Sequence, residues 1–170
     1  MKRKAIAALI IVALSVFALA AAVRENDDDD GGDILKFSTM VGVSGPYVGP
    51  TNPIRGVPGG GLPWIIAAGK GHLKVNGELK LRVTGLVIPS APFNYTNPLP
   101  EFRAIVSCQS IDANNNPTVA NVITTPFPAD TAGNAKLKTT VSLPQPCIAP
   151  VIFVTHPTSD PSRWFAATGF

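Results

Sequence analysis

The sequence has few of the residues that metal binding and catalysis most often use. Among its 170 residues there are two cysteines, Cys108 and Cys147, and two histidines, His72 and His156. A structural zinc site needs about four such ligands at short spacings, and these residues are too few and too widely separated to supply one. Each histidine stands alone beside a predicted strand, where a surface or structural role is favoured over general-base catalysis. The sequence therefore predicts no metal centre and no cofactor.

The common catalytic motifs are also missing. Residues 42–46, GVSGP, lack the second glycine of a nucleophile elbow, because Pro46 stands in its place. No Lys-Ser/Thr pair follows the glycines at 59–61, so they do not form a phosphate-binding loop. The alternation pattern puts Glu78 and Glu101 on the outward sides of their strands, away from the paired geometry that glycoside hydrolysis requires. We expect no enzymatic activity, and a secreted hydrolase is the last of the alternatives.

No window shows the spacing of an amphipathic helix. Apolar and polar residues alternate instead, which is typical of strands with one wet face. The alternating segments are 35–43, 73–83, 102–108 and 137–143, and shorter apolar runs lie at 119–124, 148–155 and 164–168. In the first segment Val41 is expected on the buried side, and in the third Ile105 is the one apolar exception on the wet side. Because 17 prolines and 15 glycines punctuate the runs, we predict an antiparallel, Ig-like β-sandwich of about eight strands.

One hairpin can be placed in register. A two-residue Asn-Gly turn would set an apolar residue opposite the carboxylate of Glu78. A three-residue loop of residues 75–77, with Gly77 in the left-handed conformation as a bulge, places Leu73 opposite Leu79 on the core side instead. Since only the second register agrees with the hydrophobic pattern, we predict that one.

The first 22 residues have the layout of a secretory signal peptide. A basic stretch at 2–4 is followed by an apolar run and an alanine-rich exit. An uncleaved anchor is the alternative, because about 18 apolar residues could just span a bilayer. We expect export to the extracellular space or the cell surface.

The segment 23–33 is acidic and glycine-containing, and it is predicted to be a flexible spacer. Its carboxylates, at Glu25, Asp27–Asp30 and Asp33, lack the alternating spacing of an EF-hand calcium loop. The remaining residues, 34–170, are enough for one domain with a sizeable core.

Export also bears on the cysteines, because exported chains meet oxidising surroundings. We predict a disulfide between Cys108 and Cys147, the simplest pairing. Cys108 continues the inward side of its strand and Cys147 opens the next apolar run, so the bridge ties the end of one strand to the start of another. In the chain-entropy model, closing a loop of roughly 40 residues stabilises the fold by about 4 kcal/mol.

Two long segments rich in proline and glycine, 44–63 and 89–100, separate the strands, and loops of this length are usually functional or mobile. They carry or adjoin aromatic residues that could contact a ligand or fold back onto the ends of the sandwich: Tyr47, Trp64, Phe93 and Tyr95. Asn94 begins an Asn-Tyr-Thr glycosylation sequon, which would be used only in a host that has the machinery.

From residue 34 onward there are ten lysines and arginines against five acids, so the predicted domain is mildly basic. The basic residues are scattered along the sequence without aromatic clusters or a recognition motif. Nucleic-acid binding would need a basic stripe or such a motif, and we do not expect it.

Several stretches are similar to a family of small uncharacterised secreted proteins from bacteria. They are GVPGGGLPWII at 56–66, FRAIVSC at 102–108, PCIAPVIFVT at 146–155 and WFAATGF at 164–170. The resemblance covers about 53–170, and it implies an exported β domain with one disulfide but no activity.

We expect a secreted, non-catalytic module with a structural or ligand-binding role at the cell exterior. Its partners would be cell-surface polysaccharide or other copies of itself. The first alternative is a subunit of an extracellular fibre, in which the strand at 35–43 inserts into a neighbour's sheet.

Overall fold

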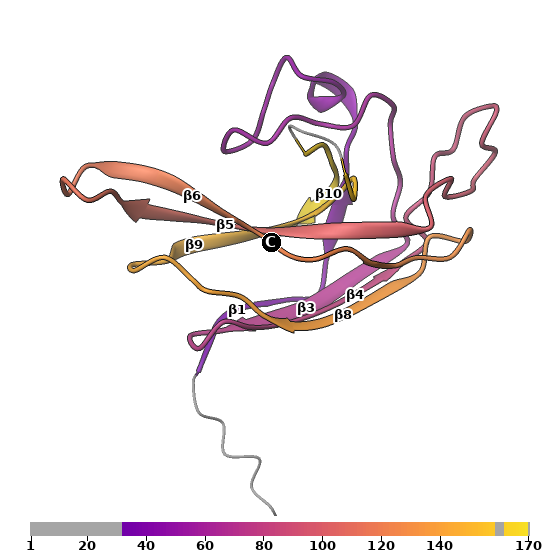
Figure 1. Cartoon of the computed structure of the whole chain (residues 1–170). Coiled ribbons are helices and arrows are strands. Elements are labelled where there is room, and N and C mark those ends of the chain that lie inside the picture. Colours follow the sequence, from indigo (N-terminus) through magenta and orange to yellow (C-terminus); the bar gives the residue numbers. More distant parts are fainter. Residues whose placement is uncertain (1–31, 159–161, 170) are drawn as a thin grey trace, which may run out of the picture.

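The computed structural model describes residues 32–158 and 162–169, which form two antiparallel sheets packed face to face (Figure 1). The four-stranded sheet has the order β1-β3-β4-β8, and the six-stranded sheet has the order β2-β10-β9-β5-β6, with β7 paired to β5. The strands are β1 Asp33–Phe37, β2 Met40–Gly42, β3 Ala68–Lys74, β4 Glu78–Thr84, β5 Glu101–Ile111, β6 Pro117–Ile123, β7 Phe127–Pro128, β8 Ala135–Thr140, β9 Ile148–Thr155 and β10 Trp164–Thr168. The predicted β-sandwich is confirmed.

The expected signal peptide, 1–22, and most of the expected spacer, 23–33, lie outside the described residues. Asp33, which we assigned to the spacer, begins β1. Within the described ranges, no helix is both long and apolar enough to cross a membrane.

The described residues form ten strands where about eight were expected. One addition is the short β7. The other arises because the predicted strand at 35–43 is two strands in different sheets, with β1 beside β3 and β2 beside β10. The crossing at Ser38 and Thr39 shifts the alternation by one residue. As a result Met40 is buried, with 7% of its surface exposed, and Val41, expected on the buried side, is 60% exposed.

The inward side of β3 makes room for this crossing. A Cβ atom at Gly69 would overlap the side chain of Met40, and one at Gly71 would overlap the Phe37 ring and the backbone of β4. Glycine in a strand often marks such a close approach. The two glycines thus let the β1–β2 connection lie against the four-stranded sheet.

The outer face of the six-stranded sheet is partly covered by the chain itself. Ile105 lies on this face, paired with Phe153, and both are buried. The Trp164 ring lies 6.0 Å from the Phe153 ring and 6.4 Å from the ring of Tyr47, which belongs to the segment 44–63 seen above this sheet in Figure 1. The apolar exception at Ile105 is therefore explained by a long loop that packs on the outward face.

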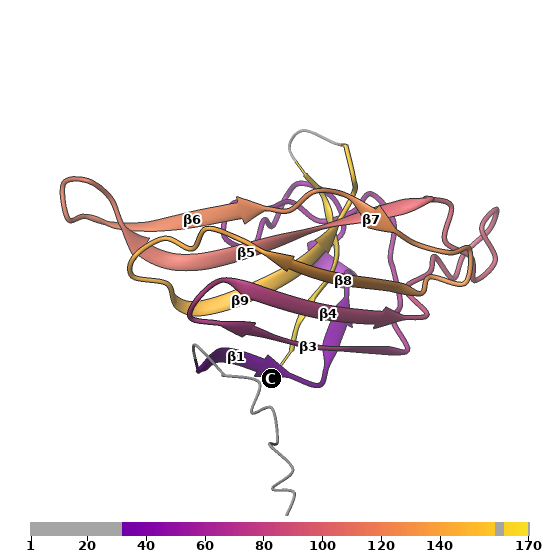
Figure 2. The same cartoon turned by 60° about the horizontal axis from the view of Figure 1, so that its bottom comes forward.

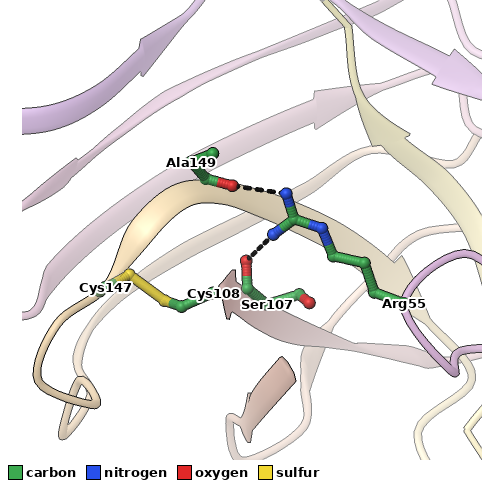
Figure 3. Close-up of a disulfide and its surroundings, with 5 residues drawn as sticks. All are labelled: Arg55, Ser107, Cys108, Cys147 and Ala149. Atoms are coloured by element: carbon green, nitrogen blue, oxygen red, sulfur yellow. Dashed lines mark hydrogen bonds between the residues drawn. A yellow bond between two sulfur atoms is a disulfide. The ribbon is translucent and has the colours of Figure 1, made fainter. Parts of the chain in front are cut away.

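Arg55 fastens the same loop to the sheet beside the disulfide (Figure 3). Its guanidinium donates hydrogen bonds of 2.8 Å to the carbonyl of Ser107 and 2.7 Å to the carbonyl of Ala149. These carbonyls flank the point where the β5–β9 register shifts. The arginine therefore donates hydrogen bonds to carbonyl groups at a position where the regular strand pairing is interrupted. The predicted disulfide, Cys108–Cys147, is confirmed at this position, with 4.9 Å between the Cα atoms.

The predicted hairpin register is also confirmed. Leu73 pairs with Leu79, and Gly77 has a φ of +87°. The amide of Gly77 donates a 3.0 Å hydrogen bond to the carbonyl of Lys74, which closes the three-residue loop. A Cβ at Gly77 would also collide with the carbonyl oxygen of Val141.

This geometry predicts that Gly77→Val destabilises the protein more than Asn76→Ala does. The valine loses roughly 1–2 kcal/mol to its left-handed backbone and adds the collision with Val141. The alanine removes one hydrogen bond, from the amide of Glu78 to the Asn76 side chain, which contributes about 0.5–1.5 kcal/mol. Urea unfolding of both variants measures the difference, and equal losses would show that the positive φ carries no strain.

Candidate cationic binding face

The outward side of the four-stranded sheet collects positive charge. In β4 the side chains of Leu79, Leu81 and Val83 are buried, so Lys80 and Arg82 point away from the core. The strand register continues each of them into a row that crosses the sheet. The first row consists of Lys36, His72, Lys80 and Lys138, and the second of Lys70, Arg82 and Lys136. We call these seven residues the cationic face.

The basic residues are scattered along the sequence but lie together in the folded protein. The residues come from β1, β3, β4 and β8, which lie side by side in Figure 2. The sequence already marks five of them as outward residues of half-wet strands, whereas Lys70 and His72 precede the predicted segment 73–83. What it does not contain is the order of the strands and their register, and these bring positions 36 and 138 into one row.

The cationic face borders a hollow of about 790 Å³, which all seven of its side chains line. A second hollow of about 690 Å³ shares Arg82 and Lys136 with the first and extends toward Thr84 and Asp130. Neighbouring strands lie about 4.8 Å apart and alternate residues about 6.7 Å apart along a strand. The result is a grid of positive groups, roughly 14 Å wide, beside two open hollows that share Arg82 and Lys136.

One carboxylate offsets part of this charge. The Nζ atom of Lys80 lies 2.9 Å from Oε1 of Glu78, and Nε2 of His72 lies 3.7 Å from the same oxygen. The hydrogen bond from Lys80, followed by the charges of Lys74 and Lys138, lowers the pKa of Glu78. Glu78 is therefore ionised at neutral pH, and it compensates one of the six lysine and arginine charges.

Such a face has a structural cost, because like charges directly opposite each other in a sheet are destabilising. Lysines on β1 and β8 have one structural explanation, since charged edge strands resist pairing with other molecules. That explanation does not apply to Lys70, Lys80 and Arg82, because these residues lie on the two inner strands, which have no free edge. Charge on inner strands, opposite like charge, forms a surface that can hold an anionic ligand.

The structure does not bring together the four aromatic residues considered as ligand contacts. Trp64 is 4% exposed and stacks on Phe165 at 4.2 Å. Phe93 packs against the edge of the core. Tyr47 is 44% exposed but lies against the outer face of the six-stranded sheet, and Tyr95 is 66% exposed in the segment 89–100. Trp64 and Phe93 thus fold back onto the sandwich, and the two tyrosines are separate surface residues.

Asn94, the sequon residue, is exposed. It has a φ of +48°, and its side-chain amide donates a 3.4 Å hydrogen bond to the carbonyl of Pro92. Glycosylation at this position stays a prediction.

His156 borders a smaller hollow of about 330 Å³, which is lined mainly by apolar side chains such as Leu62 and Trp64. Burial, followed by the charges of Arg103 and Arg163, lowers the pKa of His156. Its Nδ1 atom accepts a 3.2 Å hydrogen bond from the amide of Thr158. The described residues that line this hollow include no aspartate or glutamate.

Two aspartates have structural roles in turns. Oδ1 of Asp112 accepts hydrogen bonds from the amides of Asn114 and Asn116, and Oδ1 of Asp130 accepts one from the amide of Asn134. These backbone donors lower the pKa of both aspartates. No group of three or more metal-ligating side chains occurs in the part of the chain that the structure describes.

No family model, curated protein or solved structure matches this chain. The resemblance to small secreted bacterial proteins stays a prediction.

The like-charge rows predict that Lys138→Thr stabilises the protein. The lysine lies opposite Lys80, and threonine suits a strand better, so we expect a gain of about 0.2–1 kcal/mol at low salt. The gain should shrink near 1 M salt, where the Debye length is about 3 Å. Lys74→Thr is the matched control, because Lys74 pairs with Asp33 and its loss should give no gain. Thermal unfolding at two salt concentrations tests this, and a loss of stability in Lys138→Thr at low salt would contradict it.

Proposed function

We propose that this protein is a non-catalytic module that binds an acidic polysaccharide at the cell exterior through its cationic face. The observation that carries the proposal is the alignment of six lysine and arginine side chains, with His72, in two adjacent rows beside one open hollow. A polymer with repeated carboxylate, sulfate or phosphate groups would meet this grid at many points.

A polymer fits the face better than a small anion does. A small-anion site concentrates donors at one point, whereas these charges are spread over four strands, and five of the seven side chains are exposed. The second hollow, which continues past Arg82 and Lys136, lengthens the available path. Each contact is weak because it is exposed and screened. Affinity would therefore come from several contacts and from the release of counterions, as in other polyelectrolyte complexes.

Among polyanions, an acidic polysaccharide is favoured by the composition of the face. Single-stranded nucleic acids are usually held by aromatic side chains on which bases stack. The residues that alternate with the buried ones on β3, β4 and β8 include no phenylalanine, tyrosine or tryptophan. Phe37 of β1 is the one such aromatic residue among the described residues that line the hollow, and it is buried, with 7% of its surface exposed. The disulfide is compatible with an oxidising, extracellular location, where acidic polysaccharides are abundant.

The other two functions receive less support. A fibre subunit that donates residues 35–43 would have to release a segment whose halves are both paired within the chain's own sheets. A hydrolase would need a base that a second group orients. Glu78 lies 3.7 Å from His72, but His72 also lies between Lys36 and Lys80 in its row. Among the described residues that line its hollow, the one hydroxyl side chain is that of Ser38.

Binding of polygalacturonate, with neutral dextran as the blank, tests the proposal. We expect binding to the uronate polymer alone, weakening as salt rises. The double variant Lys70→Gln/Arg82→Gln should raise the Kd by on the order of tenfold and reduce the salt dependence of log K by about 1–2. Lys74→Gln, which removes one charge from the same sheet outside the hollow, is the control and should change the Kd less.

Two results would overturn this assignment. If polygalacturonate does not bind at low salt, or binds both variants as tightly as the original protein, the cationic face is not the binding site. If single-stranded DNA or anionic lipid vesicles bind more tightly than the polysaccharide at equal salt, the ligand belongs to a different class.

A further inference from the structure

The cationic face has an excess of positive charge that the described residues around it do not neutralise. Its six lysine and arginine side chains are offset by one carboxylate within hydrogen-bond distance, that of Glu78. The same chain carries a matching set of acids. Glu25 and Asp27–Asp30 supply five carboxylates within six consecutive residues. These residues lie outside the described ranges, and their sequence alone enters the argument.

The described chain begins beside the cationic face. Asp33 is the first residue of β1, the edge strand of the four-stranded sheet (Figure 2), and it pairs with Lys74 of β3. The carbonyl of Gly32 accepts a 3.0 Å hydrogen bond from the amide of Val75. The attachment point of the acidic segment is therefore fixed at one corner of the sheet, one row away from Lys36 and His72.

The segment is long enough to cross the whole face. An extended chain covers about 3.3–3.6 Å per residue, so the six residues from Asp33 back to Asp27 reach about 20 Å. The four strands at about 4.8 Å spacing span roughly 14 Å. Asp27 can therefore reach every strand of the sheet, including Lys136 and Lys138 on β8, whereas Asp30, three residues from Asp33, reaches only about 10 Å.

The tether also makes the contact intramolecular. A short linker holds the two groups at an effective concentration in the millimolar range. The individual ion pairs would be exposed, weak and sensitive to salt. Such a contact is strong enough to form within one chain and weak enough for a long polyanion to displace it.

From this placement we infer that the acidic segment 25–30 occupies the cationic face of its own chain and competes there with the polyanionic ligand. The intramolecular contact stands on the structure and the sequence alone, and its competition with a polysaccharide rests on the proposed function. The segment would act as a built-in counter-ligand that limits binding to polymers of high charge density.

Zero-length carbodiimide cross-linking tests the contact directly. It joins a carboxylate to a lysine amine only where the two touch. In the protein as its host processes it, we expect links from Asp27 or Asp28 to Lys136 or Lys138 at low salt, and their loss at about 1 M salt. Lys36 is too near in sequence to be informative. A mixture of isotopically labelled and unlabelled chains should give links within one chain.

Competition is measured with polygalacturonate. Replacement of Asp27–Asp30 by asparagine should tighten binding by roughly three- to tenfold at low salt, with little change at high salt. Replacement of the same four residues by glutamate is the matched control, because it keeps the charge, and it should leave the Kd unchanged.

The outcomes separate the two proposals. If no links reach β8, or if links join only differently labelled chains, the intramolecular contact is overturned whether or not the polymer binds. If links form and the polymer binds, but the asparagine variant binds no more tightly, competition is overturned. If links form and no polymer binds, the contact stands and the proposed function falls.

Discussion

The two-residue alternation of β4 is the constraint on which the rest of this structure depends. Leu79, Leu81 and Val83 fill the space between the sheets. Because Lys80 and Arg82 alternate with them along the strand, both of these side chains point to the outer face. Because β4 lies between β3 and β8, its register aligns the outward residues of three strands at once. A shift of one residue would bring charges into the core, so the packing that holds the sandwich together also positions the cationic face.

The two outer faces of the sandwich differ in what covers them. Over the six-stranded sheet, the segment 44–63 lies beside Ile105 and Trp164 and is fastened by Arg55. The outer face of the four-stranded sheet instead presents like charges opposite each other, at a cost in stability. Repulsion of this kind is expected where a ligand, and not the fold, supplies the opposite charge. In our account that charge comes from a polysaccharide and, in its absence, from the acidic segment 25–30.

Local features of this fold could be predicted from the sequence, and long-range ones could not. The strands β9 and β10 coincide with the predicted apolar runs, and the register of the β3–β4 hairpin follows from one left-handed glycine at Gly77. The crossing after Phe37 was missed, because two short polar residues do not interrupt an alternating pattern. The role of Arg55 was also missed, since the carbonyls it binds lie 52 and 94 residues away. The cationic face was missed for the same reason: its rows are set by strand order.

The central claim, that the cationic face is where a polyanion binds, is tested most directly by mapping the contact residue by residue. Nuclear magnetic resonance of the protein, titrated with short uronate oligosaccharides, reports which amides and lysine side chains change. The account predicts shifts concentrated on the outward residues of β3, β4 and β8, with Lys70, Lys80, Arg82 and Lys138 among the largest. Shifts concentrated instead around Tyr47 and Tyr95, with the four-stranded sheet unaffected, would contradict it.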